Sequence, residues 1–127
     1  MIEEKNGVFH LQNDSASYLF RVTQEGFLQQ LHFGVPVQIE DAGALAVRLG
    51  LGWGDSVQYD EVSNAACLDV LPLEWSGAGR GDYRESPLSL SEGERTLSTD
   101  FRFERFALHD EAPMHSGLPQ SRGGQAL

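Results

Sequence analysis

The sequence predicts an all-β fold, an antiparallel β-sandwich. Short segments alternate between apolar and polar residues, and aromatic and β-branched residues occupy the apolar positions. Clusters of Gly, Asn, Asp and Ser separate these segments at short intervals, as turns between strands do. A chain of 127 residues that is 40% hydrophobic suffices for one domain with a modest core.

Three strands are predicted in the first third of the chain. The first is Val8–Gln12, and a turn cluster follows at 13–16. The next two strands each place apolar side chains on one face: Tyr18, Phe20 and Val22 in the second, and Phe27, Leu31 and Phe33 in the third. The run 35–39 contains Pro36, which restricts it to a sheet edge or an irregular strand.

Residues 41–66 interrupt this rhythm and are predicted to form a long irregular loop. The segment is rich in glycine and small apolar residues, with Trp53 in its middle. Residues 44–51 have the composition for a short helix, but no capping residue precedes them and Gly50 ends the run. Loops of this length inside compact domains are usually functional or disordered.

Alternation returns at 88–91 and again at 97–103, with a turn at 92–94 between them. The pair Arg105 and Phe106 breaks the alternation, which predicts a bulge that brings Phe106 and Leu108 to the core side. The predicted sandwich core comprises Phe20, Val22, Phe27, Leu31, Leu88, Leu90, Phe101 and Phe103. The predicted strands are too few to complete a β-sandwich. We therefore expect residues 1–127 to be one truncated domain with an open sheet edge.

Composition excludes several classes of partner. The formal charge of −10 disfavours binding to nucleic acids and to anionic membranes, because both draw affinity from Lys and Arg. No apolar run approaches the roughly 20 residues that span a bilayer. The acidic start has no apolar block behind it, which predicts no secretory leader and a cytoplasmic protein. The single Cys67 agrees with a reducing compartment and is expected to be a small buried residue.

No pattern for catalysis, metal or cofactor binding stands out. The four histidines are scattered and one cysteine cannot supply a thiolate cluster, so we expect no metal site. No glycine-rich phosphate loop opens a helix and no nucleophile elbow is present, so we expect no cofactor. The acidic residues are interpreted as a solvated surface, because no pair of them can be nominated as facing carboxylates across a pocket.

One segment, residues 68–87, carries a more specific pattern. An apolar run enters a glycine-rich turn and leaves through Asp82, Tyr83 and Arg84. The glycines permit a tight turn, and Asp82 and Arg84 are suited to anchor it through charge-assisted hydrogen bonds. The plain interpretation of this segment is a structural corner, and the alternative is a family motif with a functional role.

The segment resembles the Leu-Asp-x-Leu-Pro-x-Glu-Tyr…Gly-x-x-Asp-Phe/Tyr-Arg pattern of the N-terminal domain of glycoside hydrolase family 36, the bacterial α-galactosidases. Trp75 stands where the family usually has Tyr. Weaker matches occur in the family's order at residues 9–11, 17–18, 26–28, 33–34, 100–103 and 117–119. The resemblance therefore runs from about residue 8 to residue 119.

The resemblance implies a non-catalytic N-terminal domain, part of a galactose-mutarotase-like supersandwich, in a retaining α-galactosidase that hydrolyses terminal α-galactosides of the melibiose or raffinose type. The catalytic (β/α)8 barrel, with both catalytic Asp residues, is absent from this sequence and would be the domain's partner. Tetrameric members use an Asp and an Arg of the loop before the motif to shape an active site, which implies a homo-oligomer. Here Asn64 lies near the position expected for the Arg, and Trp53 and Asp55 are the candidate substrate-facing pair.

Two alternatives remain open beside this interpretation. An independent carbohydrate-binding module would need aromatic side chains exposed on a sheet face, whereas the phenylalanines here occupy core-like positions. A structural β-domain of another multidomain protein would need only the strand pattern, and the motif at 68–84 would then be a coincidence.

Overall fold

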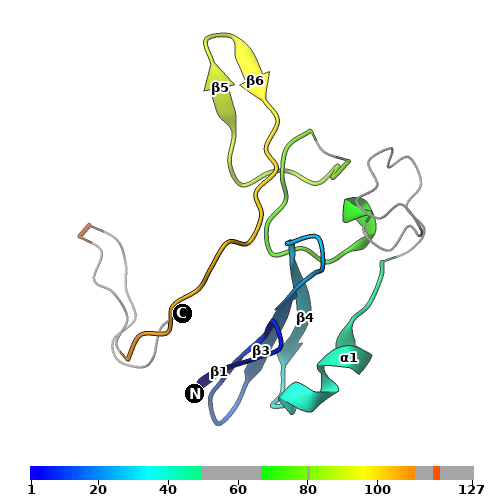
Figure 1. The fold of residues 1–127 in the computed structure, drawn as a ribbon, viewed down its shortest axis with the longest axis vertical. Coiled ribbons are helices and arrows are strands. Elements are labelled where there is room, and N and C mark those ends of the chain that lie inside the picture. Colours follow the sequence, from blue (N-terminus) through cyan, green and yellow to red (C-terminus); the bar gives the residue numbers. More distant parts are fainter. Residues whose placement is uncertain (50–66, 80, 111–115, 118–127) are drawn as a thin grey trace.

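The computed structural model describes residues 1–49, 67–79, 81–110 and 116–117, and the all-β antiparallel fold predicted from the sequence is confirmed (Figure 1). The strands are β1 (Ile2–Lys5), β2 (Val8–Gln12), β3 (Ser17–Val22), β4 (Leu28–Gly34), β5 (Leu90–Glu92) and β6 (Arg95–Leu97). The short helices are η1 (Ile39–Asp41), α1 (Ala42–Leu45) and η3 (Leu68–Val70). Strands β1 to β4 form one sheet in chain order, and β5 pairs with β6.

The three strands predicted in the first third are present as β2, β3 and β4, and β1 was missed. Strand β1 pairs with β2 in a hairpin whose turn is Asn6–Gly7, with φ values of 55° and 77°. An Asn-Gly pair is a strong sequence indication of such a turn, because both residues tolerate positive φ. The segment 35–38, predicted as an edge or irregular strand, forms no strand, and Ile39 begins η1.

A β-bulge divides β4, so the prediction that Leu31 and Phe33 share one face is wrong. Leu19 pairs with His32 and Phe20 pairs with Gln30, which leaves Leu31 as the extra residue. Leu31 packs with Leu19, whereas the Phe33 ring lies 5.9 Å from that of Tyr18. Because Tyr18 and Leu19 are adjacent in β3, the two side chains of β4 lie on opposite faces.

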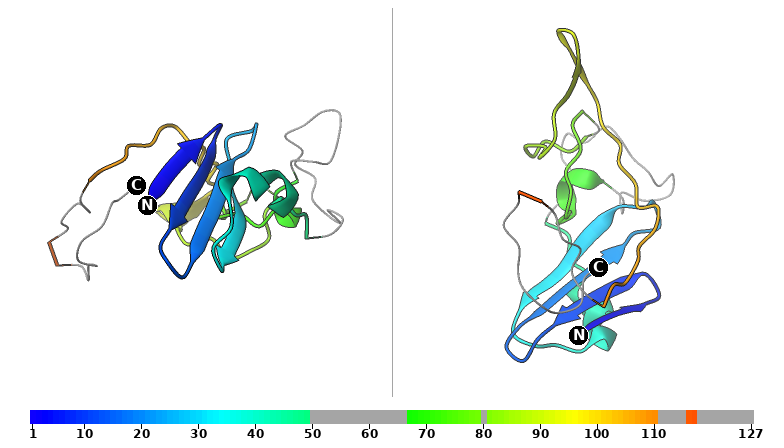
Figure 2. Two further views of the ribbon diagram at one scale, coloured as in Figure 1. Left: turned by 90° about the horizontal axis from the view of Figure 1, so that it is seen from below. Right: turned by 90° about the vertical axis from the view of Figure 1, so that its left-hand side faces the viewer.

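Both faces of the four-stranded sheet are partly covered, and Figure 2 shows α1 and the segment after β6 on opposite sides of it. On the helix side, Leu19, Leu31 and Ala42 form a buried cluster. On the other side, the stacked rings of Phe9 and Phe20 lie under a later part of the chain. These layers make the core of the molecule.

The open edge of β4 is covered by the segment that follows η3. The amide of Gln30 donates to the carbonyl of Pro72 (2.7 Å), and the amide of Glu74 donates to that of Leu28 (2.9 Å). These bonds add a short antiparallel bridge to the edge of the sheet, centred on Gln29 and Leu73. The motif at residues 68–84 is thereby attached directly to the main sheet.

The C-terminal strands differ most from expectation. The turn predicted at 92–94 is confirmed as the β5–β6 hairpin, which extends away from the four-stranded sheet in Figure 1. The strand predicted over 97–103 ends at Leu97, and residues 98–108 are extended without a strand. Two aromatic side chains of this segment, Phe103 and Phe106, nevertheless contact the Phe9 ring on the four-stranded sheet.

The predicted core list is therefore partly right. Phe20, Phe27 and Leu31 are buried. Val22, Leu88 and Phe103 are half-buried. Leu90 and Phe101 are exposed. Of the two residues that the sequence placed on the core side at 105–108, Phe106 is 43% exposed but packs edge to face on the buried Phe9 ring, whereas Leu108 is exposed. These exposed positions lie on the hairpin and the extended segment, where no second sheet faces them in the described part of the chain.

Only the beginning of the predicted loop at 41–66 falls within the described residues. It contains the one-turn helix α1 at Ala42–Leu45 rather than an irregular start, and the candidate helix at 44–51 is absent over 46–49. Gln38 precedes η1, and its amide donates to the Asp41 carboxylate at 3.2 Å. The remainder of this loop lies outside the described residues.

Candidate functional site

Asp82 and Arg84 form a buried clasp at the end of the glycine-rich turn. The Arg84 guanidinium donates to both carboxylate oxygens of Asp82, from Nε at 2.8 Å and from Nη2 at 3.0 Å. Asp82 Oδ1 also accepts the Arg84 backbone N–H at 3.1 Å. The Asp82 side chain is fully buried and that of Arg84 is 35% exposed. A bidentate ion pair of this kind fixes the relative orientation of the two side chains and also neutralises the buried charge.

The same guanidinium binds η3. Its Nη1 donates to the Leu71 carbonyl at 2.6 Å, and Nη2 donates to the Leu68 carbonyl at 2.7 Å. The side chains of Cys67, Val70 and Leu71 in this segment form a small buried apolar cluster. The clasp thus connects the exit of the turn to the segment that precedes it, 13 to 16 residues back in the chain.

The helix η3, to which the clasp is bonded, also contacts the described residues just before position 50. The Leu49 amide donates to the Val70 carbonyl at 2.7 Å, so Leu49 lies against η3. Gln29 Nε2 of β4 holds the Val47 carbonyl at 3.0 Å. Trp53 and Asp55 themselves lie outside the described residues, and so does Asn64.

Tyr83, the middle residue of the predicted motif, is 71% exposed. Its neighbours Asp82 and Arg84 turn inward, so the aromatic side chain of Tyr83 is presented at the surface. The motif thus combines a buried ion pair with one exposed aromatic residue.

Two backbone features close the glycine-rich turn on the segment after β6. The amide of Ala78 donates to Thr99 Oγ1 at 2.8 Å, and the Thr99 amide donates to the Ala78 carbonyl at 2.9 Å. A Cβ added at Gly77 would stand 2.8 Å from the Thr99 carbonyl oxygen, which is closer than real Cβ contacts. Glycine at position 77 is thus required for this approach.

A second polar pair, Tyr18 and Glu74, joins β3 to the motif, and the sequence analysis did not anticipate it. The Tyr18 hydroxyl donates to Glu74 Oε2. Burial raises the pKa of Tyr18 to about 12, and the hydrogen bond and charge of Glu74 act in the same direction. The partners are 56 residues apart, and no local pattern marks either as one of a pair.

Two apolar hollows lie on the surface of the described residues. One, of about 350 Å³, is lined by Met1, Ile2, Leu11, Gln12, Asn13, Ala16, Ser17, Tyr18 and Phe33. The other, of about 400 Å³, is lined by Gly26, Phe27, Leu28, Trp75, Leu88, Phe101, Arg102 and Phe103. Neither lining includes an Asp or Glu, so neither offers the carboxyl pair that glycoside hydrolysis needs.

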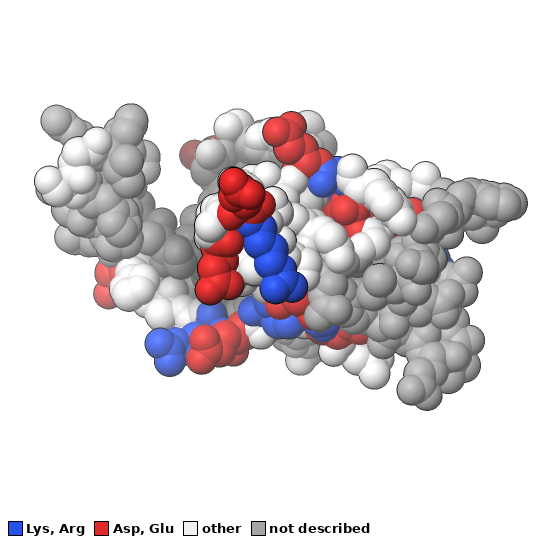
Figure 3. All heavy atoms as spheres, turned by 90° about the horizontal axis from the view of Figure 1, so that it is seen from above, with Lys and Arg blue, Asp and Glu red and all other residues white. Residues whose placement is uncertain are grey.

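In the part of the chain that the structure describes, no three His, Cys, Asp or Glu side chains gather as metal ligands would. Over the same residues, no helix is long and apolar enough to cross a membrane. On the side of the molecule that Figure 3 shows, seen from above, acidic and basic side chains lie beside one another instead of forming one patch of either sign.

Residues 26–126 match the model of the glycosyl hydrolase family 36 N-terminal domain. The chain therefore belongs to this family of domains. Alpha-galactosidase Mel36A of Lactobacillus acidophilus is 27% identical over 119 residues, which are 94% of this chain and 16% of that protein. The chain thus spans about a sixth of the length of this relative.

Solved structures show the same fold. The galactosidase domain of alpha-galactosidase-sucrose kinase, AgaSK, superimposes with a TM-score of 0.82 at 22% identity, over 98% of this chain and 17% of that one. The GH36 alpha-galactosidase AgaB from Geobacillus stearothermophilus gives a TM-score of 0.75 at 25% identity, over 96% of this chain and 16% of that one.

Proposed function

We propose that this chain is the non-catalytic N-terminal domain of a retaining α-galactosidase, which supports a catalytic (β/α)8 barrel and contributes to contacts between subunits. The proposal rests chiefly on the match of residues 26–126 to the N-terminal domain of the family. The relatives that share this region are named as α-galactosidases, and most of their length lies outside it. The substrates of the parent enzyme would be terminal α-galactosides of the melibiose or raffinose type.

The geometry of the described residues supports a structural role. Retaining hydrolysis needs two carboxyl groups about 5 Å apart across a pocket. The conspicuous carboxylate of the family motif, Asp82, is instead buried against Arg84 with no exposed side-chain surface. A carboxylate in that position organises the backbone and has no access to a sugar.

Complementation tests this function. The chain would be mixed with the remainder of the Lactobacillus acidophilus relative, produced without its own matching region, and hydrolysis of an aryl α-galactoside would be measured. We expect neither piece alone to be active and the mixture to recover hydrolysis. Activity of the chain alone, in a sample free of contaminating enzyme, would contradict the non-catalytic role, and an inactive mixture of folded pieces would contradict the supporting role.

A carbohydrate-binding module is the second candidate, since several aromatic side chains are exposed after all. Phe101 is 49% exposed and Trp75 is 43% exposed, but their rings meet edge to face at 89°. This arrangement covers part of one ring and offers no flat pair of faces on which a sugar would stack. Calorimetric titration of the isolated chain with galactose and raffinose separates the candidates, and we expect no binding at millimolar sugar.

A further inference from the structure

One row of side chains crosses all four strands of the main sheet on a single face. Ile2 of β1 pairs with Leu11 of β2, Leu11 pairs with Tyr18 of β3, and Tyr18 pairs with Phe33 of β4. Directly paired residues of antiparallel strands project to the same side of a sheet. We call these four residues the cross-strand row. It contains no ionised side chain.

Among the described residues, the neighbouring row on the same face is covered by a later segment of the chain, whereas Phe33 of the cross-strand row is exposed and the other three members are half-buried. Phe9 is 1% exposed and Phe20 is 8% exposed. The Phe106 ring meets the Phe9 ring edge to face at 4.9 Å, and Phe103 approaches it from 6.1 Å. The extended segment after β6 therefore covers the second row of this face.

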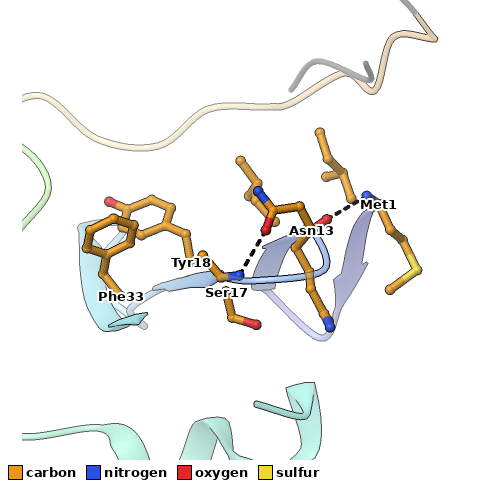
Figure 4. Close-up of a pocket in the computed structure, with 9 residues that line it drawn as sticks. Met1, Asn13, Ser17, Tyr18 and Phe33 are labelled. Carbon is orange, nitrogen blue, oxygen red and sulfur yellow. Dashed lines mark hydrogen bonds between the residues drawn. The ribbon is translucent and has the colours of Figure 1, made fainter. Parts of the chain in front are cut away.

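Over the cross-strand row the surface is hollowed instead. All four of its residues line the hollow of about 350 Å³, and Phe33 is 74% exposed. Figure 4 shows Tyr18 and Phe33 side by side at one end of this hollow and Met1 at the other. The polar groups near it are engaged: the Asn13 carboxamide oxygen accepts the amides of Ser15 and Ala16, at 2.9 and 2.8 Å.

The chemistry of this floor selects an apolar occupant. A charged or sugar-like ligand would find aliphatic and aromatic surface and few unengaged polar groups. Apolar side chains of a second β-layer fit the floor, because sheets of a sandwich pack face to face about 10 Å apart and interdigitate such rows. On this face of the described structure, only the row beneath Phe103 and Phe106 is covered in this way.

Relatives contain the polypeptide that such a layer requires. The matched region is only 16% of the Lactobacillus acidophilus protein and 17% of the AgaSK galactosidase domain. The rest of such a protein is the nearest source of chain, since it is tethered to this domain. A second copy of the present chain is a poorer occupant, because each copy has a formal charge of −10.

We propose that the cross-strand row, Ile2, Leu11, Tyr18 and Phe33, is the docking floor for an apolar β-segment of the parent α-galactosidase that lies outside the present sequence. This inference rests on the proposed function and adds to it the surface through which the domain joins the remainder of the enzyme. Phe33 is the most exposed member of the row and should contribute most to the contact.

Photo-cross-linking tests the assignment directly. A p-benzoylphenylalanine would replace Phe33 in one sample and Val35 in a control, and each would be irradiated with a saturating amount of the remainder of the Lactobacillus acidophilus relative. Val35 is 73% exposed, almost as much as Phe33, and does not line the hollow. We expect strong cross-linking from position 33 to an apolar segment of the remainder, identified by mass spectrometry, and at least fivefold less from position 35.

Affinity measurements provide the second readout. Phe33→Asp should weaken binding of the remainder at least tenfold, while Val35→Asp should change it less than twofold. Both side chains are exposed, so both variants should keep the circular dichroism spectrum of the parent chain. A fusion of the chain to the remainder, with the same two cross-linker positions, gives the result without requiring the remainder to fold alone.

The outcomes separate the two proposals. If the folded remainder does not bind the unmodified chain, both the proposed function and the docking floor are wrong. If it binds, but Phe33→Asp has no effect or position 33 cross-links only to another copy of the chain, the docking floor alone is wrong. Equal losses from Phe33→Asp and Val35→Asp would also overturn it, because the effect would then be one of added charge.

Discussion

Two Asp-x-Arg pairs in this chain have the same spacing and nearly the same geometry but differ in burial. Asp82 and Arg84 are joined at 2.8 and 3.0 Å, and Asp100 and Arg102 at 2.9 and 3.1 Å. The Asp82 side chain is fully buried, whereas that of Asp100 is 25% exposed. The pairs therefore form an internal comparison of buried and solvated charge.

We expect Asp82→Asn to lower the free energy of unfolding by about 2 kcal/mol, since it leaves the guanidinium of Arg84 without its buried counter-charge. Part of the usual loss is avoided because Arg84 still contacts water and keeps two carbonyl partners. Asp100→Asn is the matched control and should cost under about 1 kcal/mol. Urea unfolding followed by circular dichroism measures both, and equal losses would mean that burial of Asp82 has no special effect.

Tyr18 gives a second prediction at the residue scale, in alkaline solution. The pKa of Tyr18 is raised to about 12 in the folded chain, mainly by burial and then by Glu74. An unfolded tyrosine releases its proton near pH 10, so between about pH 10 and 12 the folded state holds the extra proton. The stability of the fold should then fall as pH rises through this interval.

Ultraviolet titration of the phenolates would check the Tyr18 assignment. The chain has three tyrosines, and one of them should ionise near pH 12. Tyr18→Phe should remove that step, and Glu74→Gln should lower its midpoint without restoring the ordinary value, because burial is the larger cause. If the ionisation near pH 12 persists in Tyr18→Phe, it belongs to another tyrosine.

At the scale of elements, two glycines with opposite environments test how tightly the motif packs. A Cβ at Gly77 would meet the Thr99 carbonyl oxygen at 2.8 Å, whereas a Cβ at Gly43, in α1, would meet nothing within 4 Å. Gly77→Ala should destabilise the fold by about 2 kcal/mol through overpacking against backbone. Gly43→Ala should leave stability unchanged or raise it by about 0.5 kcal/mol, because alanine favours the helix. Thermal unfolding of both variants is the measurement, and an unaffected Gly77→Ala would show that the turn can shift away from Thr99.

The strands of the main sheet that the sequence predicted correctly are those with apolar alternation. Strands β2, β3 and β4 combine alternation with turn residues, and each pairs with its neighbour. Strand β1 was missed because its Ile-Glu-Glu-Lys sequence has no apolar alternation, as suits a charged edge strand. Only its Asn6–Gly7 turn indicated a hairpin.

Alternation misled the prediction where no partner strand was available. Phe101 and Phe103 alternate with polar residues, yet Phe101 is exposed and Phe103 is half-buried. The alternation does not reveal whether another strand supplies hydrogen bonds, and the Phe103 amide instead donates to the carbonyl of Gly26, at the β3–β4 turn. The clasp of Asp82 and Arg84 could be anticipated because its partners are two residues apart, whereas Tyr18 and Glu74 are too distant in sequence to be paired by any local pattern.

At the scale of the whole molecule, several large apolar side chains of the described residues are exposed. The cross-strand row is hollowed, and the second hollow adds Trp75 and Phe101, which are 43% and 49% exposed. Large exposed apolar patches mark interaction surfaces in soluble proteins. We therefore treat the chain as a unit whose apolar faces are completed by contact with other polypeptide.

The final prediction is that the isolated chain, without such a partner, self-associates at micromolar concentration, as the proposed contacts between subunits also imply. Burial of apolar surface contributes roughly 25 cal/mol per Å², while the formal charge of −10 on each copy opposes association. Salt screens exposed charges beyond about 10 Å at 0.1 M, so association should strengthen as ionic strength rises. Sedimentation velocity at low and moderate salt measures this, and Phe33→Asp should weaken it at both. A chain that stays monomeric at every salt concentration would show that burial of its exposed apolar side chains against a second copy does not offset the loss of translational and rotational freedom.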